Sequence, residues 1–170
     1  NTKIETFSSN YELYGEITGR VMTIIRDMTP RCFRYSIDEA FAVLDGFSTE
    51  QLRDWGEQLH DRIQMSVGMP ISIGIARTKT LAKMASYFAK KYPGYNHVCI
   101  IDSEEQRLKA ARLYPIGEIW GIGRRYQARL EAMGIRTAHD FASHSASWVR
   151  STFKTVVICL LYTSPSPRDR

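Results

Sequence analysis

The stretch RCFRYSIDEAFAVLD, residues 31–45, decides the fold class, because two short apolar segments in it flank a pair of acids. Residues 31–37 alternate between apolar and polar side chains, with Phe33 and Tyr35 on one face, and residues 40–44 form a second apolar run. Such alternation is typical of β-strands. We therefore predict two neighbouring strands here.

Two adjacent carboxylates, Asp38 and Glu39, lie between these predicted strands. Because side chains alternate along a strand, both acids reach one small volume only if the backbone bends there, as it does at the start of a hairpin. A divalent cation such as Mg²⁺, which prefers oxygen ligands, would then offset their charge. The alternative is an ordinary turn with two solvated acids, and a phosphoryl-transfer site needs at least one further carboxylate.

Helices and a further strand are predicted around this stretch. An apolar stripe at three- and four-residue spacing indicates a helix over residues 10–28, after a Ser9/Glu12 capping box, and Ser48–Met65 follows as a second helix. Pro70–Ala76 is the clearest strand. The order is that of an incomplete ferredoxin-like α+β sheet without its first strand, so we expect the chain to begin inside a domain.

The remainder of the chain is predicted to be mostly helical. A helix from Thr78 to about Tyr92, the strand Val98–Ile101 and a helix to Leu113, capped by Asp102 or Ser103, are expected in this order. Short helices punctuated by glycine follow to about Phe153 and predict a small all-helical domain. The proline-broken end, residues 158–170, is expected to be disordered and foreign to the fold.

Three lysines share one face of the predicted helix that starts at Thr78. Lys79, Lys83 and Lys90 are four and seven residues apart, so they fall in one stripe, opposite an apolar face. An ordinary solvated lysine face and a surface that contacts nucleotide or DNA phosphates explain this stripe equally well.

A glycine-rich segment, Gly121-Ile122-Gly123, precedes Arg124 and Arg125. Glycines at a helix N-terminus let backbone N–H groups approach a phosphate closely, and arginines add charge without reading sequence. Two glycines alone are a weak signal, since they often only form turns. The further residues Arg129, Gly134-Ile135 and Arg136 make a helix-hairpin-helix motif that binds the DNA backbone the better interpretation.

Composition and charge exclude several classes of protein. No apolar stretch approaches the roughly 18–20 residues of a membrane-spanning helix, and the three cysteines form no CxxC pair, so we expect a soluble cytoplasmic protein without zinc. Residues 1–70 hold 7 Lys/Arg against 11 Asp/Glu, whereas residues 71–170 hold 16 against 7. This asymmetry favours metal chemistry in the first part and phosphate binding in the second.

Taken together, these segments resemble the Y-family translesion DNA polymerases, and most closely their UmuC group. The matching stretches are FSSNYELY (7–14), YSIDEAF (35–41), GIARTKTLAKMAS (74–86), FAKK (88–91) and WGIGRRYQARLEAMGI (120–135). The resemblance spans about residues 4–157. It implies that residues 1–8 end a fingers segment, that 9–102 form a polymerase palm, and that 103–157 form a thumb with the helix-hairpin-helix motif.

The resemblance also implies roles for individual residues. Asp38 and Glu39 would be the second and third catalytic carboxylates, holding a pair of Mg²⁺ ions beside the primer 3′ end. Lys90 would contact the incoming triphosphate, and Lys79 and Lys83 would contact phosphate or DNA. The loop Gly121-Ile122-Gly123, with Arg124, Arg125 and Arg129, would hold the duplex.

The family's first catalytic aspartate and its aromatic steric gate have no counterpart in the sequence, so the two-ion site is expected to be incomplete and the isolated chain inactive. The expected function of the intact protein is error-prone DNA synthesis in the SOS response to DNA damage, on primer-template DNA and deoxynucleoside triphosphates. A UmuD-like subunit, a sliding clamp and a recombinase filament are the partners that the resemblance implies. Two alternatives stay open: a non-catalytic DNA-binding module and, less favoured because it predicts no helix-hairpin-helix, a nucleotide cyclase.

Overall fold

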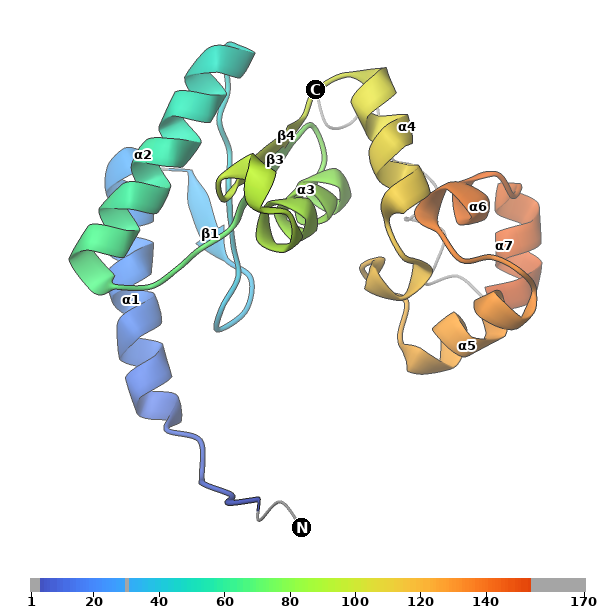
Figure 1. Cartoon of the computed structure of the whole chain (residues 1–170), viewed down its shortest axis with the longest axis horizontal. Helices are drawn as coiled ribbons and strands as arrows, with labels where there is room; N and C mark the ends of the chain where they lie inside the picture. The colour runs from blue at the N-terminus through green and yellow to red at the C-terminus, as the bar shows by residue number, and fades with distance from the viewer. Residues whose placement is uncertain (1–3, 30, 154–170) are drawn as a thin grey trace. The chain divides into compact units, whose positions relative to one another are not determined.

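The computed structural model describes residues 4–29 and 31–153 of the chain. The predicted tail, residues 158–170, lies outside the described residues. The chain is a mixed α/β protein that divides into two compact units, residues 1–71 and 72–170 (Figure 1). The predicted division into a palm over 9–102 and a thumb over 103–157 stays a prediction.

The N-terminal unit consists of a hairpin and two helices. Its elements are α1 (Tyr11–Met28), β1 (Cys32–Arg34), β2 (Ala40–Ala42) and α2 (Thr49–Val67). Met22, Ile24 and Ile25 of α1 and Leu59 and Ile63 of α2 are buried, and the two helices pack together. Ile24, Leu59 and Ile63 lie on the predicted apolar stripes, whereas Met22 and Ile25 do not. The helix order and the two adjacent strands are therefore confirmed.

Capping residues set where these helices begin. Ser48 and Gln51 form a reciprocal capping box at α2, which confirms the predicted start of this helix. The predicted Ser9/Glu12 box at α1 is wrong: the side chain of Asn10 accepts the N–H of Leu13 at 3.1 Å. Asparagine is as strong an N-cap as serine, and it occupies the next position along the chain.

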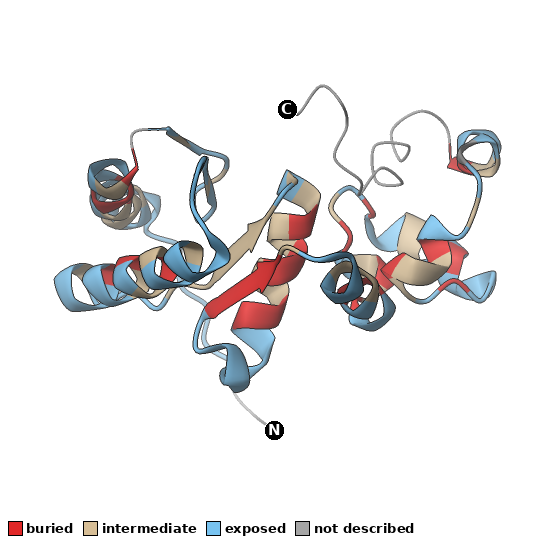
Figure 2. Cartoon of the chain, turned by 90° about the horizontal axis from the view of Figure 1, so that it is seen from above, coloured by how far each residue is buried: buried red, intermediate tan, exposed pale blue. Residues whose placement is uncertain are grey.

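The C-terminal unit begins with a parallel strand pair and the helix between them. Its first elements are β3 (Ile73–Ala76), α3 (Lys79–Lys91), the 3₁₀ turn η1 (Pro93–Tyr95) and β4 (Val98–Ile101), with Ile73 opposite Val98. Leu81, Met84, Ala85 and Phe88 are buried on one face of α3, as predicted. Figure 2 shows burial concentrated on β4 and α3.

The strands of the described residues pair as two separate two-stranded sheets, β1 with β2 and β3 with β4. The strands expected for the incomplete sheet are therefore present as two pairs, and no ladder joins β2 to β3 among the described residues.

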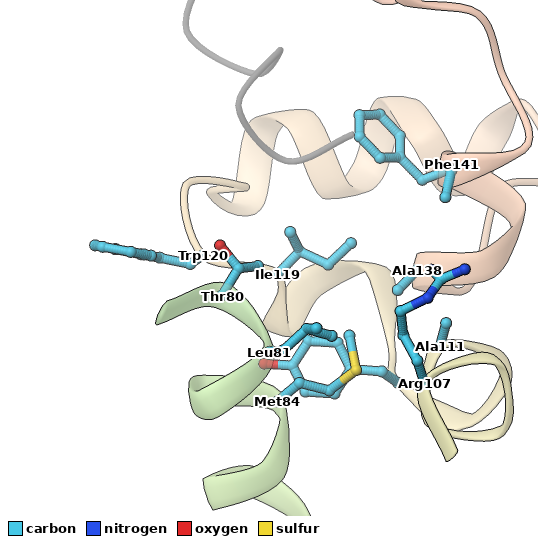
Figure 3. Close-up of a pocket in the computed structure, with 11 residues that line it drawn as sticks. Thr80, Leu81, Met84, Arg107, Ala111, Ile119, Trp120, Ala138 and Phe141 are labelled. Carbon is cyan, nitrogen blue, oxygen red and sulfur yellow. The ribbon is translucent and has the colours of Figure 1, made fainter. Parts of the chain in front are cut away.

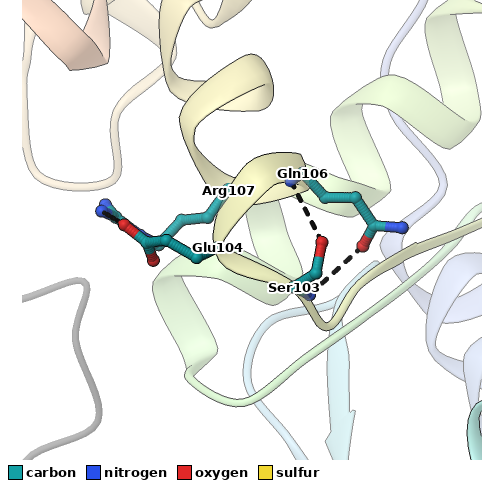
Figure 4. A network of polar contacts seen from close by, with 4 residues as sticks. All are labelled: Ser103, Glu104, Gln106 and Arg107. Atoms are coloured by element: carbon teal, nitrogen blue, oxygen red, sulfur yellow. Dashed lines mark hydrogen bonds and ion pairs between the residues drawn. The ribbon is translucent and has the colours of Figure 1, made fainter.

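Short helices complete the C-terminal unit, as predicted. They are α4 (Glu104–Leu113), η2 (Ile116–Glu118), α5 (Arg124–Ala132), α6 (Ala138–Ala142) and α7 (Ala146–Phe153). Ser103 and Gln106 cap α4 reciprocally, beside an ion pair between Glu104 and Arg107 (Figure 4). One cluster of buried side chains extends from α3 through α7, so these helices share a core.

A close approach of backbone to backbone fixes α3 against β3. A Cβ atom built on Gly74 would lie 2.1 Å from the carbonyl oxygen of Ala82 and 2.1 Å from the amide nitrogen of Ser86. The hydroxyl of Ser86 also donates to the carbonyl of Ser72 at 3.2 Å. Only glycine fits at position 74 without moving the helix.

Gly74→Ala should therefore destabilise the C-terminal unit by roughly 2–3 kcal/mol, since the added methyl group meets rigid backbone. Gly94→Ala is the matched control, because no atom lies within 4 Å of a Cβ atom placed there and no strain is expected. Urea unfolding followed by far-UV circular dichroism measures both. Equal stability of the two variants would contradict the close approach.

A second prediction concerns the cap of α6. The Asp140 carboxylate accepts the backbone N–H groups of Arg136 and Thr137, both at 3.0 Å, and these bonds hold the pKa of Asp140 below its ordinary value of 3.8. A carboxyl whose pKa is lowered on folding stabilises the fold above its unfolded pKa, and this contribution is lost as pH falls through the folded value.

Asp140→Asn should lower stability at pH 7 by no more than about 1 kcal/mol, because solvent screens this partly exposed group. The difference from wild type should shrink as pH falls below 3.8. Thermal unfolding at pH 7 and pH 3 tests this, and an equal difference at both pH values would show that the charge is not responsible.

Candidate functional site

The two predicted carboxylates lie in the turn that joins β1 to β2. The carbonyl of Glu39 accepts two backbone N–H groups, from Tyr35 at 2.9 Å and from Ser36 at 3.1 Å. The first strand consequently ends at Arg34, three residues earlier than predicted, and the chain bends over residues 36–38. The backbone bend that the acidic pair requires is therefore present.

Asp38 is held by a residue that the sequence reasoning did not select. The hydroxyl of Ser36 donates to the Asp38 carboxylate at 2.7 Å, and the backbone N–H of Asp38 donates to the same hydroxyl at 3.4 Å. Thr18 of α1 donates to the carbonyl of Ile37 at 2.6 Å and so ties the turn to the helix. A serine two residues before an aspartate was the local signal for this turn.

Aromatic side chains stiffen the hairpin below the turn. Phe33 lies directly opposite Phe41 in the antiparallel register, and their rings stack with centroids 5.6 Å apart. The ring of Tyr35 meets Phe41 edge to face at 5.7 Å. Cross-strand aromatic pairs stabilise a hairpin and fix its register, and the register decides where Asp38 and Glu39 fall.

Asp38 and Glu39 are both exposed, and they offer carboxylate oxygens, the hard donors that suit Mg²⁺. Within the part of the chain that the structure describes, no group of three or more His, Cys, Asp or Glu side chains is placed to hold a metal ion. The turn thus contributes two candidate ligands and falls short of a complete ligand set.

The three lysines of α3 do not share one environment. Lys79 and Lys90 are exposed, whereas Lys83 is half-buried and its Nζ lies 5.2 Å from the ring centroid of Trp120. The predicted common stripe is therefore present in the helix geometry, but one of its members is placed over an indole ring. Trp120 is a second residue that the sequence reasoning did not select.

The glycine loop lies at the N-terminus of α5, as its sequence predicts. Gly121 adopts a positive φ of 95°, and Gly123 is the N-cap of α5 without a side-chain capping bond. Between them the side chain of Ile122 is buried and anchors the loop. The first N–H groups of α5 therefore lie beside the exposed residues Arg124 and Arg125.

Arg129 is engaged within the helical region. Its guanidinium donates to the carbonyl of Thr152 at 3.0 Å and lies 5.2 Å from the ring centroid of Phe153.

The acidic turn belongs to the N-terminal unit, and the basic residues of α3 and α5 belong to the C-terminal unit. None of the helices in the described residues is long and apolar enough to cross a membrane.

Solved structures share this fold. An insertion ternary complex of Dbh DNA polymerase superimposes with a TM-score of 0.74 at 23% identity, covering 90% of this chain and 44% of that one. A DinB family error-prone DNA polymerase from Sulfolobus solfataricus gives a TM-score of 0.77 at 22% identity, covering 95% of this chain and 50% of that one. The fold is thus that of part of a Y-family DNA polymerase.

Sequence relatives identify the family. The model of the impB/mucB/samB family matches residues 1–87, and the chain belongs to this family. Protein UmuC of Salmonella typhimurium is 39% identical over 89% of this chain and 36% of its own length, and Protein ImpB of the same organism is 37% identical over 91% and 37%. The UmuC-like resemblance is confirmed, and the chain spans about a third of the length of these relatives.

Proposed function

We propose that this chain supplies the acidic hairpin and a duplex-binding helical region of an error-prone, translesion DNA polymerase. The observation that carries the proposal is the hairpin turn, in which Asp38 and Glu39 follow one another at a backbone bend in a member of the impB/mucB/samB family. A DinB relative among the solved structures is described as an error-prone DNA polymerase, which supports the same reaction class.

The hairpin would serve template-directed nucleotidyl transfer. Mg²⁺ ions, when bound, lower the energy of the attacking and leaving oxygens in such a transfer. Asp38 and Glu39 would hold them, Asp38 with its carboxylate oriented by Ser36, and Glu39 nearest the primer hydroxyl. At least one further carboxylate is needed, so the described chain alone is proposed to be inactive.

The C-terminal unit would hold the substrates. Exposed Lys90, with Lys79, suits the phosphates of the incoming deoxynucleoside triphosphate. The backbone N–H groups that follow Gly123, with the exposed Arg124 and Arg125, suit the phosphates of a duplex in a helix-hairpin-helix thumb. Arg129, already bonded to Thr152, would help mainly by holding α7 in place.

The cellular role and the partner proteins are proposed from membership of the impB/mucB/samB family. As part of a UmuC-like polymerase, the protein would work in damage tolerance during the SOS response, in the cytoplasm, with a UmuD-like subunit, a sliding clamp and a recombinase filament.

A non-catalytic DNA-binding module is the second candidate. The exposure of Asp38 and Glu39 favours it, as does the lack of a third metal-binding side chain among residues 4–29 and 31–153. This alternative keeps the glycine loop and its arginines and assigns the acidic turn a structural role.

Arg124→Ala combined with Arg125→Ala should weaken binding of the 170-residue chain to duplex DNA of any sequence, because both changes remove phosphate contacts. The logarithm of the binding constant should also depend less steeply on the logarithm of salt, by about 0.9 for each phosphate that is no longer neutralised. Fluorescence anisotropy with two unrelated duplexes at several salt concentrations measures both quantities.

Arg150→Ala, an exposed arginine of α7, is the control for loss of charge alone. If the double variant binds with the affinity and salt dependence of wild type, the glycine loop does not bind the duplex.

Catalysis is tested after fusing the N-terminal segment of Salmonella typhimurium Protein UmuC to this chain. The fusion should extend a primer in the presence of Mg²⁺, and Glu39→Ala or Asp38→Ala should abolish extension because each removes a metal ligand. Asp45→Ala is the matched control, since Asp45 pairs with Arg31 beside the hairpin instead. Extension that survives Glu39→Ala would exclude Glu39 from the mechanism and favour the binding-module alternative.

A further inference from the structure

Trp120 occupies the position immediately before the glycine loop, and its contacts reach back to α3. Its indole ring is half-buried under Lys83, with Nζ 5.2 Å from the ring centroid. It also borders a cavity of about 20 Å³ together with Thr80, Leu81 and Met84 of α3. Figure 3 shows Trp120 and Thr80 at the same end of this cavity.

The residues on either side of Trp120 are anchored, so the ring sits in a short segment with little freedom. Ile119 and Ile122 are both buried, and the N–H of Ile122 donates to the carbonyl of Ile119 at 2.9 Å. The hydroxyl of Tyr114 donates to the carbonyl of Glu118 at 2.7 Å. The orientation of Trp120 is consequently linked to that of Gly121, which already holds a positive φ of 95°.

Lys83 differs from its two neighbours on the helix face. Lys79 and Lys90 are exposed, whereas Lys83 is half-buried over the indole. An ammonium group over an indole face is attracted by the negative electrostatic potential of the ring. Because Lys83 is half-buried and held over the ring, its ammonium group is less open to a phosphate than that of exposed Lys90.

We infer that Lys83 is a positioning residue for the duplex-binding loop, which acts on DNA by holding Trp120 in place and not through a phosphate contact of its own. This inference rests on the proposed function of the loop. The Lys83–Trp120 contact links α3, whose other lysines are proposed to face the nucleotide, to the segment proposed to hold the duplex.

The two roles of Lys83 predict different salt dependences. Loss of a positioning contact leaves the number of neutralised phosphates unchanged, so affinity falls by the same factor at every salt concentration. Loss of a direct phosphate contact also lowers the slope of log K against log salt by about 0.9. The slope therefore separates the roles even where affinities are equal.

The test uses the 170-residue chain and a duplex probe with four variants: Lys83→Met, Trp120→Leu, the two combined, and Lys83→Arg. Lys83→Met should weaken binding about threefold to tenfold with an unchanged salt slope. Trp120→Leu should give a similar loss, and the combined variant should lose little more than either alone, because both changes break one contact. Lys83→Arg should keep the affinity of wild type, since guanidinium also binds an indole face.

Lys109→Met, an exposed lysine of α4, is the matched control and should show effects additive with Trp120→Leu. Circular dichroism identifies any variant that fails to fold. Trp120→Leu then still decides the outcome, because it breaks the contact and keeps the charge of Lys83: weaker binding supports the positioning role, and wild-type affinity contradicts it. A slope lowered by about 0.9 in Lys83→Met, additive losses in the combined variant, or wild-type affinity of Lys83→Met would each overturn the inference.

The Arg124→Ala/Arg125→Ala double variant separates the two levels of failure. If it weakens binding while Lys83→Met does not, only the role of Lys83 is wrong. If it binds as wild type does, the proposed function of the loop fails, and the inference fails with it.

Discussion

The acidic site depends on one pair of hydrogen bonds, from the backbone N–H groups of Tyr35 and Ser36 to the carbonyl of Glu39. In a continuous strand, Asp38 and Glu39 would point to opposite faces, and one ion could not bind both. The two bonds close a turn instead, and Ser36 then orients the Asp38 carboxylate. The aromatic pair of Phe33 and Phe41 fixes the register on which this turn depends.

A comparable constraint holds the basic surfaces in place. Gly74 lets β3 and α3 approach until no Cβ atom fits between them, so α3 has little freedom to slide along the strand. The buried face of α3 then joins the core of α4–α7. Lys83 and Trp120 are therefore held in contact, because α3 and the segment before the glycine loop belong to the same packed core.

Features with a local pattern were predictable from the sequence. The cap at Ser48, the buried face of α3, the strand Val98–Ile101 and the bend at Asp38-Glu39 all follow from spacing and turn chemistry, and the structure contains them. Features that depend on distant residues were not predictable. The contact of Lys83 with Trp120 joins residues 37 positions apart and leaves no periodic signal, and the cap at Asn10 was a choice between two adjacent residues of similar capping strength.

The distribution of charge bears on the choice between polymerase and binding module. A module that only binds DNA needs the basic C-terminal unit, and an acidic surface in the same chain would repel phosphates and weaken binding. Residues 1–70 nevertheless hold 11 Asp/Glu against 7 Lys/Arg, and two of these acids are consecutive at a tied, hydrogen-bonded turn. Cations bound by these two acids would neutralise their charge, and the site would then attract the phosphates of a nucleotide or a primer end. The acidic turn would thus cost affinity in a binding module, whereas it would have a role in the proposed metal-dependent polymerase.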